Sequence, residues 1–174
     1  MFNDYFINLI FFCSGDELLI TELLFNGAFT NLSVPQICAL LSCFVWEEKI
    51  QQSADLTDDL AKPLKVLQTV AKKIVVVSKD SNLEIDEQTY IERFKPNLMD
   101  VVYAWAKGKS FHEICQMTDA FEGSIIRCLK RLEELIRQLI QAARAMGNNE
   151  LEEKFTEAIK IIKRDIVFAS SLYL

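Results

Sequence analysis

Glycine, proline and histidine are scarce in this sequence, whose 174 residues include 5 Gly, 3 Pro and 1 His. An all-β sandwich or barrel needs turn residues about every 8–12 positions, and so few glycines and prolines cannot supply them. A Rossmann or P-loop nucleotide site needs a glycine-rich loop after a strand, which is also missing. The class that remains is an all-α fold.

Ligands for a metal ion and a disulfide framework are lacking as well. The only histidine is His112, and the cysteines form no Cys-x-x-Cys motif, so the sequence offers no set of zinc ligands. An odd number of cysteines argues against a closed disulfide framework and favours free thiols in a reducing compartment. The five are Cys13, Cys38, Cys43, Cys115 and Cys128. We expect this chain to bind no metal and no cofactor.

The sequence has no excess of positive charge. It contains 19 Lys and Arg and 25 Asp and Glu, which gives a net charge of -6. No global basic field attracts nucleic acid, although a groove on an acidic protein can still be basic locally. Hydrophobic residues make up 51% of the chain and charged residues 25%. This balance predicts a globular chain, and its length corresponds to about one domain.

A long hydrophobic run is missing too. The most apolar stretch, residues 5–12, is much shorter than the roughly 20 residues that span a bilayer. Asp4 stands where a signal peptide carries a basic residue, so we expect no membrane partner. We expect residues 1–13 to form an apolar segment distinct from one helical domain over residues 14–174.

Hydrophobic residues at spacings of three and four predict a bundle of about seven helices. Asp16, Ser33 and Asp86 stand where a helix start needs a capping side chain, and Pro35 lies in a first turn. The β-branched residues 74–77 are assigned to a helix end, because the residues before them have helical spacing. Further helices are expected over about residues 56–78, 98–107, 110–117, 124–146 and 150–172, with a kink or restart at Pro96.

Two short motifs imitate catalytic sites. Gly108-Lys109-Ser110 copies the end of a Walker A loop, but Tyr103 stands where that loop needs its first glycine. His112 and Glu113 copy the start of the zincin helix, but Gln116 replaces the second histidine. We interpret both as chance matches and expect no catalytic residues.

The expected long helix over residues 124–146 has two distinct faces. Its apolar positions alternate in steps of four and three, as in a seam buried against other helices: Ile125, Leu129, Leu132, Ile136, Leu139 and Ala143. At about 100° per residue, a narrow polar stripe lies opposite: Arg127, Arg131, Glu134, Gln138 and Gln141. A second, basic stripe beside it contains Lys130, Arg137 and Arg144.

Three interpretations of the polar stripe stay open from spacing alone. Guanidinium groups can stack on bases and pair with phosphates, and Glu and Gln can bond the base edges of single strands. The same residues can instead form a solvated surface with helix pairs such as Lys130–Glu134. A helix-turn-helix across residues 118–123 is the third, with Ser124, Arg127, Cys128 and Arg131 as recognition residues. The helix is long for that role, and the acidic net charge opposes it.

Five sequence blocks carry a resemblance to a known family: LLSCFV (40–45), LMDVVYAW (98–105), MTDAFEGSIIR (117–127), RLEEL (131–135) and KRDIVFASSLYL (163–174). In this order they resemble the C-terminal helical (DSHCT) domain of exosome-associated DExH-box RNA helicases. The resemblance runs from about Asp16 to the last residue. The FEGSIIR and SLYL segments are more similar to the nuclear branch than to the cytoplasmic superkiller branch.

The resemblance implies a bundle that closes a channel through which single-stranded RNA moves in the 3′-to-5′ direction. One long "ratchet" helix of the family touches the bases, and residues 124–146 match it. Arg131 and Glu134 fall at its RNA-facing positions, Arg127 and Gln138 lie on the same face, and Glu48 is a further RNA contact by resemblance. The implied partners are the parent's helicase core and, through the parent, the exosome and adaptor proteins. Nuclear residence is implied, with a cytoplasmic one as the alternative.

The ATPase motifs of that family are absent from this sequence, which has no Walker A loop and no Asp-Glu-x-His box. We therefore expect no enzyme activity from the chain itself, with ATP and Mg²⁺ bound only by the core of a longer, ATP-dependent parent helicase. The alternative function is a purely structural or protein-interaction bundle that braces the helicase core.

Overall fold

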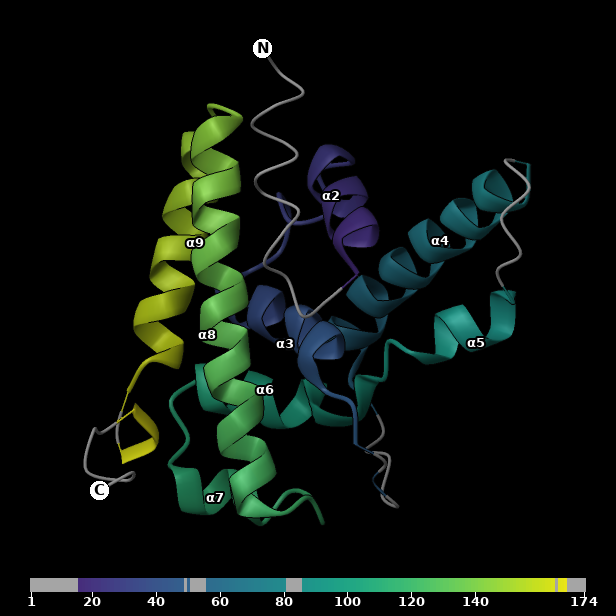
Figure 1. Cartoon of the computed structure of the whole chain (residues 1–174). Coiled ribbons are helices and arrows are strands. Elements are labelled where there is room, and N and C mark those ends of the chain that lie inside the picture. The colour runs from purple at the N-terminus through teal and green to yellow at the C-terminus, as the bar shows by residue number, and fades with distance from the viewer. Residues whose placement is uncertain (1–15, 49, 51–55, 81–85, 165, 169–174) are drawn as a thin grey trace.

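The computed structural model describes residues 16–48, 50, 56–80, 86–164 and 166–168 of the chain (Figure 1). All regular structure in these residues is helical, which confirms the expected all-α bundle. The α-helices are α2 (Glu17–Phe25), α3 (Val34–Val45), α4 (Asp58–Asp80), α5 (Glu87–Glu92), α6 (Met99–Ala106), α7 (Phe111–Cys115), α8 (Glu122–Ala145) and α9 (Asn149–Ile162). Two 3-10 helices are η1 (Pro96–Leu98) and η2 (Ile166–Phe168).

Capping side chains start the helices where the sequence predicts. Asp16 Oδ1 accepts a hydrogen bond from the Leu19 N–H at 3.0 Å, and Asp86 Oδ2 accepts one from the Thr89 N–H at 2.8 Å. At Ser33 the backbone N–H donates to Gln36 Oε1 at 2.9 Å, which pairs the cap with the third helical residue. These bonds satisfy N–H groups that have no partner within a helix.

The β-branched residues 74–77 continue α4, as predicted. Ile74 and Val75 are buried on its inner face, while Val76 and Val77 point to solvent. The preceding turns of α4 already present buried side chains at helical spacing, so the tertiary contacts of the helix outweigh the strand preference of this run.

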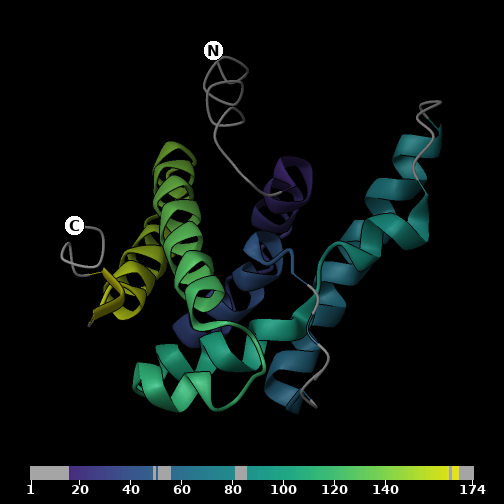
Figure 2. The same ribbon diagram turned by 60° about the horizontal axis from the view of Figure 1, so that its bottom comes forward.

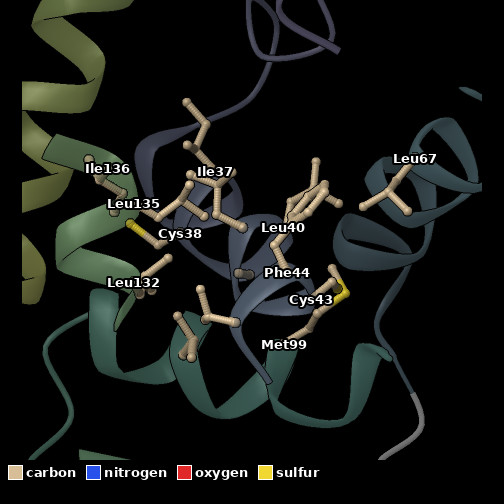
Figure 3. Packing of buried hydrophobic residues seen from close by; sticks show 14 of the residues in the cluster. Ile37, Cys38, Leu40, Cys43, Phe44, Leu67, Met99, Leu132, Leu135 and Ile136 are labelled. Carbon is tan, nitrogen blue, oxygen red and sulfur yellow. The ribbon is translucent and has the colours of Figure 1, made fainter. Parts of the chain in front are cut away.

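Helix α3 forms the axis of the bundle. It packs against α4, α6, α8, α9 and η1, and its residues from Ile37 to Val45 are all buried. Figure 3 shows Ile37 and Cys38 of α3 facing Leu132, Leu135 and Ile136 of α8. The antiparallel pair α8–α9 stands on one side of α3 and the pair α4–α5 on the other (Figures 1 and 2).

The last helix is shorter than predicted, since α9 ends at Ile162 and residues 166–168 form η2. The expectation of a helix to about residue 172 is therefore wrong. At the end of α9, the Trp105 indole N–H donates to the Ile162 carbonyl at 3.0 Å. The Arg164 guanidinium lies 3.7 Å over the Trp105 ring and donates to the carbonyls of Trp105 and Lys109. These contacts with the α6–α7 segment draw the chain out of the helical path.

In the described part of the chain, no helix combines the length and the apolar character that crossing a membrane requires. The expected N-terminal segment, residues 1–13, lies outside the described residues.

Candidate nucleic-acid interface

The apolar seam predicted for the long helix is the buried face of α8. All six predicted positions are at most 3% exposed, namely Ile125, Leu129, Leu132, Ile136, Leu139 and Ala143. They face α3 and α9, the helices with which α8 shares its core. Because this seam holds α8 in one orientation, it also decides which residues lie on the outer face.

The polar stripe opposite this seam points outward. The side chains of Arg127, Arg131 and Glu134 are 63%, 46% and 60% exposed. Gln138 is half-buried and Gln141 is exposed further along the same face. Spacings of four, three, four and three residues put these five on adjacent turns of one helix side. The structure therefore brings four of the predicted RNA-binding residues onto one continuous outer face.

The segment after α3 brings two carboxylates to this face. Arg127 Nη2 lies 3.1 Å from Glu48 Oε1, and Arg131 Nη1 lies 3.5 Å from Glu47 Oε2. Arg127 Nη2 also donates to Ser124 Oγ at 3.0 Å. Two consecutive glutamates thus pair with two arginines one helical turn apart. The fifth predicted residue, Glu48, joins the other four through this contact.

Glu47 is the member of this cluster that the sequence analysis missed. Residues 47 and 48 are adjacent acids directly after the last turn of α3, and the family resemblance pointed to Glu48 alone. The sequence signal that could have found Glu47 is its position next to Glu48, since two adjacent acids in one short segment can both reach the same neighbouring helix.

In the second, basic stripe, Arg137 and Arg144 form ion pairs with glutamates of the same bundle. Arg137 donates to Glu133, and this hydrogen bond raises the pKa of the guanidinium. The same Arg137 lies 3.9 Å from Glu134 Oε2. Arg144 donates to Glu152 of α9 at 2.6 Å and 2.9 Å, which links the two helices. The stripe with Arg137 and Arg144 is therefore engaged in pairs within the bundle.

The ion pairs of Arg127 and Arg131 are exposed on both sides. Pairs of this kind contribute about 0–1 kcal/mol, because water screens the charges and ordering long side chains costs entropy. A phosphate or base can replace the carboxylate partner at little cost. Glu47 and Glu48 therefore position the guanidinium groups without withdrawing them from solvent.

The motifs that imitate catalytic sites have structural uses. The Ser110 N–H donates to Glu113 Oε2 at 2.8 Å, and its hydroxyl oxygen accepts from the Glu113 N–H, so Ser110 is the cap of α7. His112 Nε2 lies 3.0 Å from Gln116 Nε2 on the exposed side of that helix. In the helix-turn-helix interpretation, Ser124 and Cys128 read bases, yet both are buried. This burial disfavours a recognition helix that begins at residue 124.

Comparison with known proteins gives a match over almost the whole chain. The model of the DSHCT (NUC185) domain matches residues 12–169. Exosome RNA helicase MTR4 of Homo sapiens is 62% identical over 161 residues, which are 92% of this chain and 16% of that protein. ATP-dependent RNA helicase mtr4 of Schizosaccharomyces pombe is 54% identical over 162 residues, 92% of this chain and 14% of that protein. The DExH-box ATP-dependent RNA helicase DExH10 of Arabidopsis thaliana is 51% identical, with 92% and 16% covered.

These relatives confirm the resemblance to exosome-associated helicases predicted from the sequence blocks. The chain spans about one sixth of the length of the curated relatives it matches. The matched residues include all of α2 to α9, so the helical bundle described above is the unit that these proteins share. The chain belongs to the DSHCT (NUC185) domain family.

Proposed function

We propose that this chain is the C-terminal RNA-guiding domain of an ATP-dependent 3′-to-5′ RNA helicase that feeds RNA to the exosome. Its relatives of Homo sapiens and Mus musculus are exosome RNA helicases by name, which supports this assignment. In this proposal the parent's core binds ATP and Mg²⁺, and the chain has no catalytic step of its own. Its partners are single-stranded RNA, the parent's core and, through the parent, the exosome and its adaptors. Its compartment is the nucleus.

The outer face of α8 is the observation that carries this proposal. Arg127 and Arg131 present guanidinium groups that can stack on a base or bond a phosphate. Glu134, one turn further, presents an exposed carboxylate that can accept a hydrogen bond from a base edge. Gln138 extends the face, and Glu48 adds an acceptor beside Arg127. A single strand laid along α8 therefore meets cations and hydrogen-bonding groups at each turn.

Weak binding suits a domain that guides a moving strand. The net charge of -6 provides no long-range attraction, so the contacts on α8 must supply the local affinity. Exchange between Glu47 or Glu48 and an incoming phosphate leaves the arginines paired both before and after binding. Each step of the strand therefore breaks few net interactions.

The test measures binding of oligo(A) RNA to the chain at several salt concentrations. Each phosphate that the protein neutralises adds about 0.7 to the steepness with which log K falls with log salt for a single strand, so losing one contact lowers the slope by that amount. We expect the double variant Arg127→Gln and Arg131→Gln to lower this slope by about 1.4 and to weaken binding. The matched control is the double variant Lys72→Gln and Lys73→Gln, which removes two exposed charges from α4 and should leave the slope unchanged, because no phosphate contact is assigned to α4.

An unchanged slope in the double variant would contradict the RNA role and favour the purely structural or protein-interaction bundle. A second test uses a longer helicase that contains this domain, with Arg131→Ala and Glu134→Ala. We expect slower unwinding with unchanged ATP binding, since neither side chain belongs to an ATP site in this proposal. If the variant unwinds RNA at the wild-type rate, the RNA contacts assigned to Arg131 and Glu134 are wrong.

A further inference from the structure

Phe121 is the most exposed large hydrophobic side chain among the residues that the structure describes, at 74%. It stands at the N-cap of α8, directly before the first turn of the helix that carries the candidate RNA face. A phenylalanine that exposes so much of its surface offers one face of its ring to any flat group that approaches the start of α8.

The fold does not use the Phe121 side chain. It lies outside the hydrophobic core and makes no capping hydrogen bond at the start of α8. At the same position of α2, α5 and α9, the side chains of Asp16, Asp86 and Asn148 each accept a hydrogen bond from a backbone N–H. A polar residue at an N-cap stabilises a helix more than an apolar one does. Neither core packing nor capping therefore accounts for an aromatic residue here.

Gly123 provides the space in which the Phe121 ring lies. A Cβ atom at residue 123 would stand 2.8 Å from Phe121 Cε1 and 3.2 Å from Phe121 Cδ1. The ring therefore lies over the side of Gly123 that a side chain would otherwise occupy. Any larger residue at position 123 would push the ring away, so this pair of residues places an aromatic surface on one particular side of α8.

That side of α8 is the one that carries the polar stripe. Gly123 precedes Arg127 by four residues and Gln141 by eighteen, which correspond to about one turn and to five turns of an α-helix. The ring over Gly123 therefore extends the stripe by one turn toward the start of the helix. The stripe itself contains cations and hydrogen-bonding groups but no aromatic side chain, and Phe121 adds one at its end.

Arg127 reaches back toward the same turn of the helix. Its Nη2 atom donates to Ser124 Oγ at 3.0 Å, next to Gly123, and its side chain is 63% exposed. An exposed ring and an exposed guanidinium thus lie together at the start of α8. Sites for unpaired nucleic acid combine these two groups, because the cation bonds the backbone while the aromatic ring stacks on a base.

Other ligands use only part of this arrangement. A simple anion can bond Arg127 but gains nothing from the Phe121 ring, and an apolar side chain gains nothing from the guanidinium. A nucleotide of a single strand uses both groups, and stacking accepts any base because every base has a π face. The chemistry at the start of α8 therefore favours an unpaired nucleotide.

We propose that Phe121 stacks on one unpaired base of the RNA strand that lies along α8. Gly123 keeps the ring on the side of the polar stripe, and Arg127 bonds a phosphate next to the stacked base. The proposal rests on the RNA role assigned to α8, and it adds a base-stacking position before the first arginine of that face. Stacking neutralises no phosphate, so this contact should not depend on salt as the arginine contacts do.

The first test measures binding of oligo(A) RNA to the chain with Phe121→Leu, which keeps an apolar side chain but removes the aromatic face. We expect the affinity to fall about fivefold or more, while the slope of log K against log salt stays unchanged. Phe121→Tyr keeps the ring and should bind within about twofold of wild type. The matched control is Phe25→Leu, which removes a ring that is 58% exposed on α2 and should also change the affinity by no more than about twofold.

The second test asks whether the effect depends on a base. Its probe is an oligomer of tetrahydrofuran abasic sites, which has the same number of phosphates as the oligo(A) but no bases. We expect wild type and Phe121→Leu to bind this strand equally. Gly123→Ala displaces the ring without removing it, so oligo(A) affinity should fall here too, although alanine favours a helix more than glycine does and urea unfolding should show no loss of stability.

These measurements separate the stacking contact from the arginine contacts. Wild-type oligo(A) affinity in Phe121→Leu would overturn the stacking proposal, and the RNA role of α8 would stand if the salt slope still depended on Arg127 and Arg131. An equal loss of affinity for the abasic strand would overturn it as well, because Phe121 would then act on α8 and not on a base. If the arginine variants leave the slope unchanged while Phe121→Leu weakens binding of oligo(A) alone, the arginine role fails and the stacking contact stands.

Discussion

At the scale of single residues, Arg164 holds the segment that follows α9 onto the bundle. Its guanidinium stacks 3.7 Å over Trp105 and donates to the Trp105 carbonyl at 2.7 Å. The planar group suits both contacts at once, since it presents a face to the ring and N–H groups at its edge. A lysine ammonium is a point charge on a flexible stem and cannot stack in this way.

We therefore expect Arg164→Lys to lower the free energy of unfolding by about 1–3 kcal/mol, from lost charged hydrogen bonds and a weaker cation–π contact. Urea unfolding followed by circular dichroism measures the change. Lys160→Gln, at an exposed position of α9, is the control and should change stability by no more than about 0.5 kcal/mol. If Arg164→Lys and wild type are equally stable, then the positive charge alone is enough to stabilise the contact with Trp105, and the planar shape of the guanidinium is not needed.

Asp100, in the first turn of α6, gives the bundle a pH-dependent stability. Burial raises the pKa of its carboxyl above 3.8, against a smaller opposing effect of the backbone N–H groups of Val101 and Asp100. Its Oδ1 atom is buried without a hydrogen-bond partner. In the pH range between the unfolded and the folded pKa, the folded state therefore keeps a proton that the unfolded state has released.

The stability contributed by this proton is present below pH 3.8 and is lost as the pH rises through the folded pKa. Asparagine does not titrate, so we expect the Asp100→Asn variant to lose no stability over this pH range. The free energy of unfolding of the variant minus that of wild type should therefore be greater at neutral pH than in acid. Thermal unfolding of both proteins across this range measures the difference. A constant difference at all pH values would contradict a raised pKa at Asp100.

At the scale of elements, α8 combines a buried seam with an outward polar face. Leu132 is fully buried and faces Cys38 of α3 (Figure 3). Leu132→Ala leaves a cavity in a close-packed region, for which we expect a loss of about 2–5 kcal/mol in unfolding free energy. Gln141→Ala on the exposed face of the same helix is the matched control, with an expected change within about 0.5 kcal/mol. A loss as small as that of the control would mean that α8 is not held through this seam.

Helix starts and the two faces of α8 could be predicted from the sequence, because their causes are local. A cap such as Asp16 acts on an N–H three residues away. The seam of α8 follows from the helical period alone. The polar stripe was predictable as the outer face for the same reason, while its contact with RNA stays a prediction.

The end of α9 and the partners of the arginines could not be predicted in this way. Arg164 leaves the helical path to reach a carbonyl 59 residues away in the chain. Arg127 meets Glu48 across 79 residues. Both contacts depend on how α3 and α6 lie in the bundle, and the period of one helix carries no information about its neighbours.

At the scale of the whole molecule, α3 joins the two sides of the bundle. It contacts α4 on one side and α8 and α9 on the other, and nearly all of its surface is buried. No large part of the described core can leave without exposing a face of α3. We therefore expect the bundle to unfold as one cooperative unit, as small single domains commonly do.

The cysteines can report on this cooperativity. Burial raises the pKa of the Cys38 and Cys128 thiols to about 12, and it also raises the pKa of Cys43. A thiol reagent attacks the thiolate, so these three sites react only when the core opens. Cys115 is half-buried on α7 and reacts first. Cys13 lies outside the described residues, and Cys13→Ser removes its contribution.

In this Cys13→Ser protein, we expect one fast thiol and three slow ones under native conditions. Cys38 and Cys43 lie on α3 and Cys128 on α8, so a shared opening must separate α3 from its neighbours. The free energy of opening obtained from labelling should then be equal at the three sites and match that of urea unfolding. Faster labelling of Cys128 than of Cys43 would mean that α8 detaches first and that the bundle is not one unit. Such a local opening would also expose the seam under Arg127 and Arg131, and the rigid outer face on which the proposed RNA contact depends would be lost.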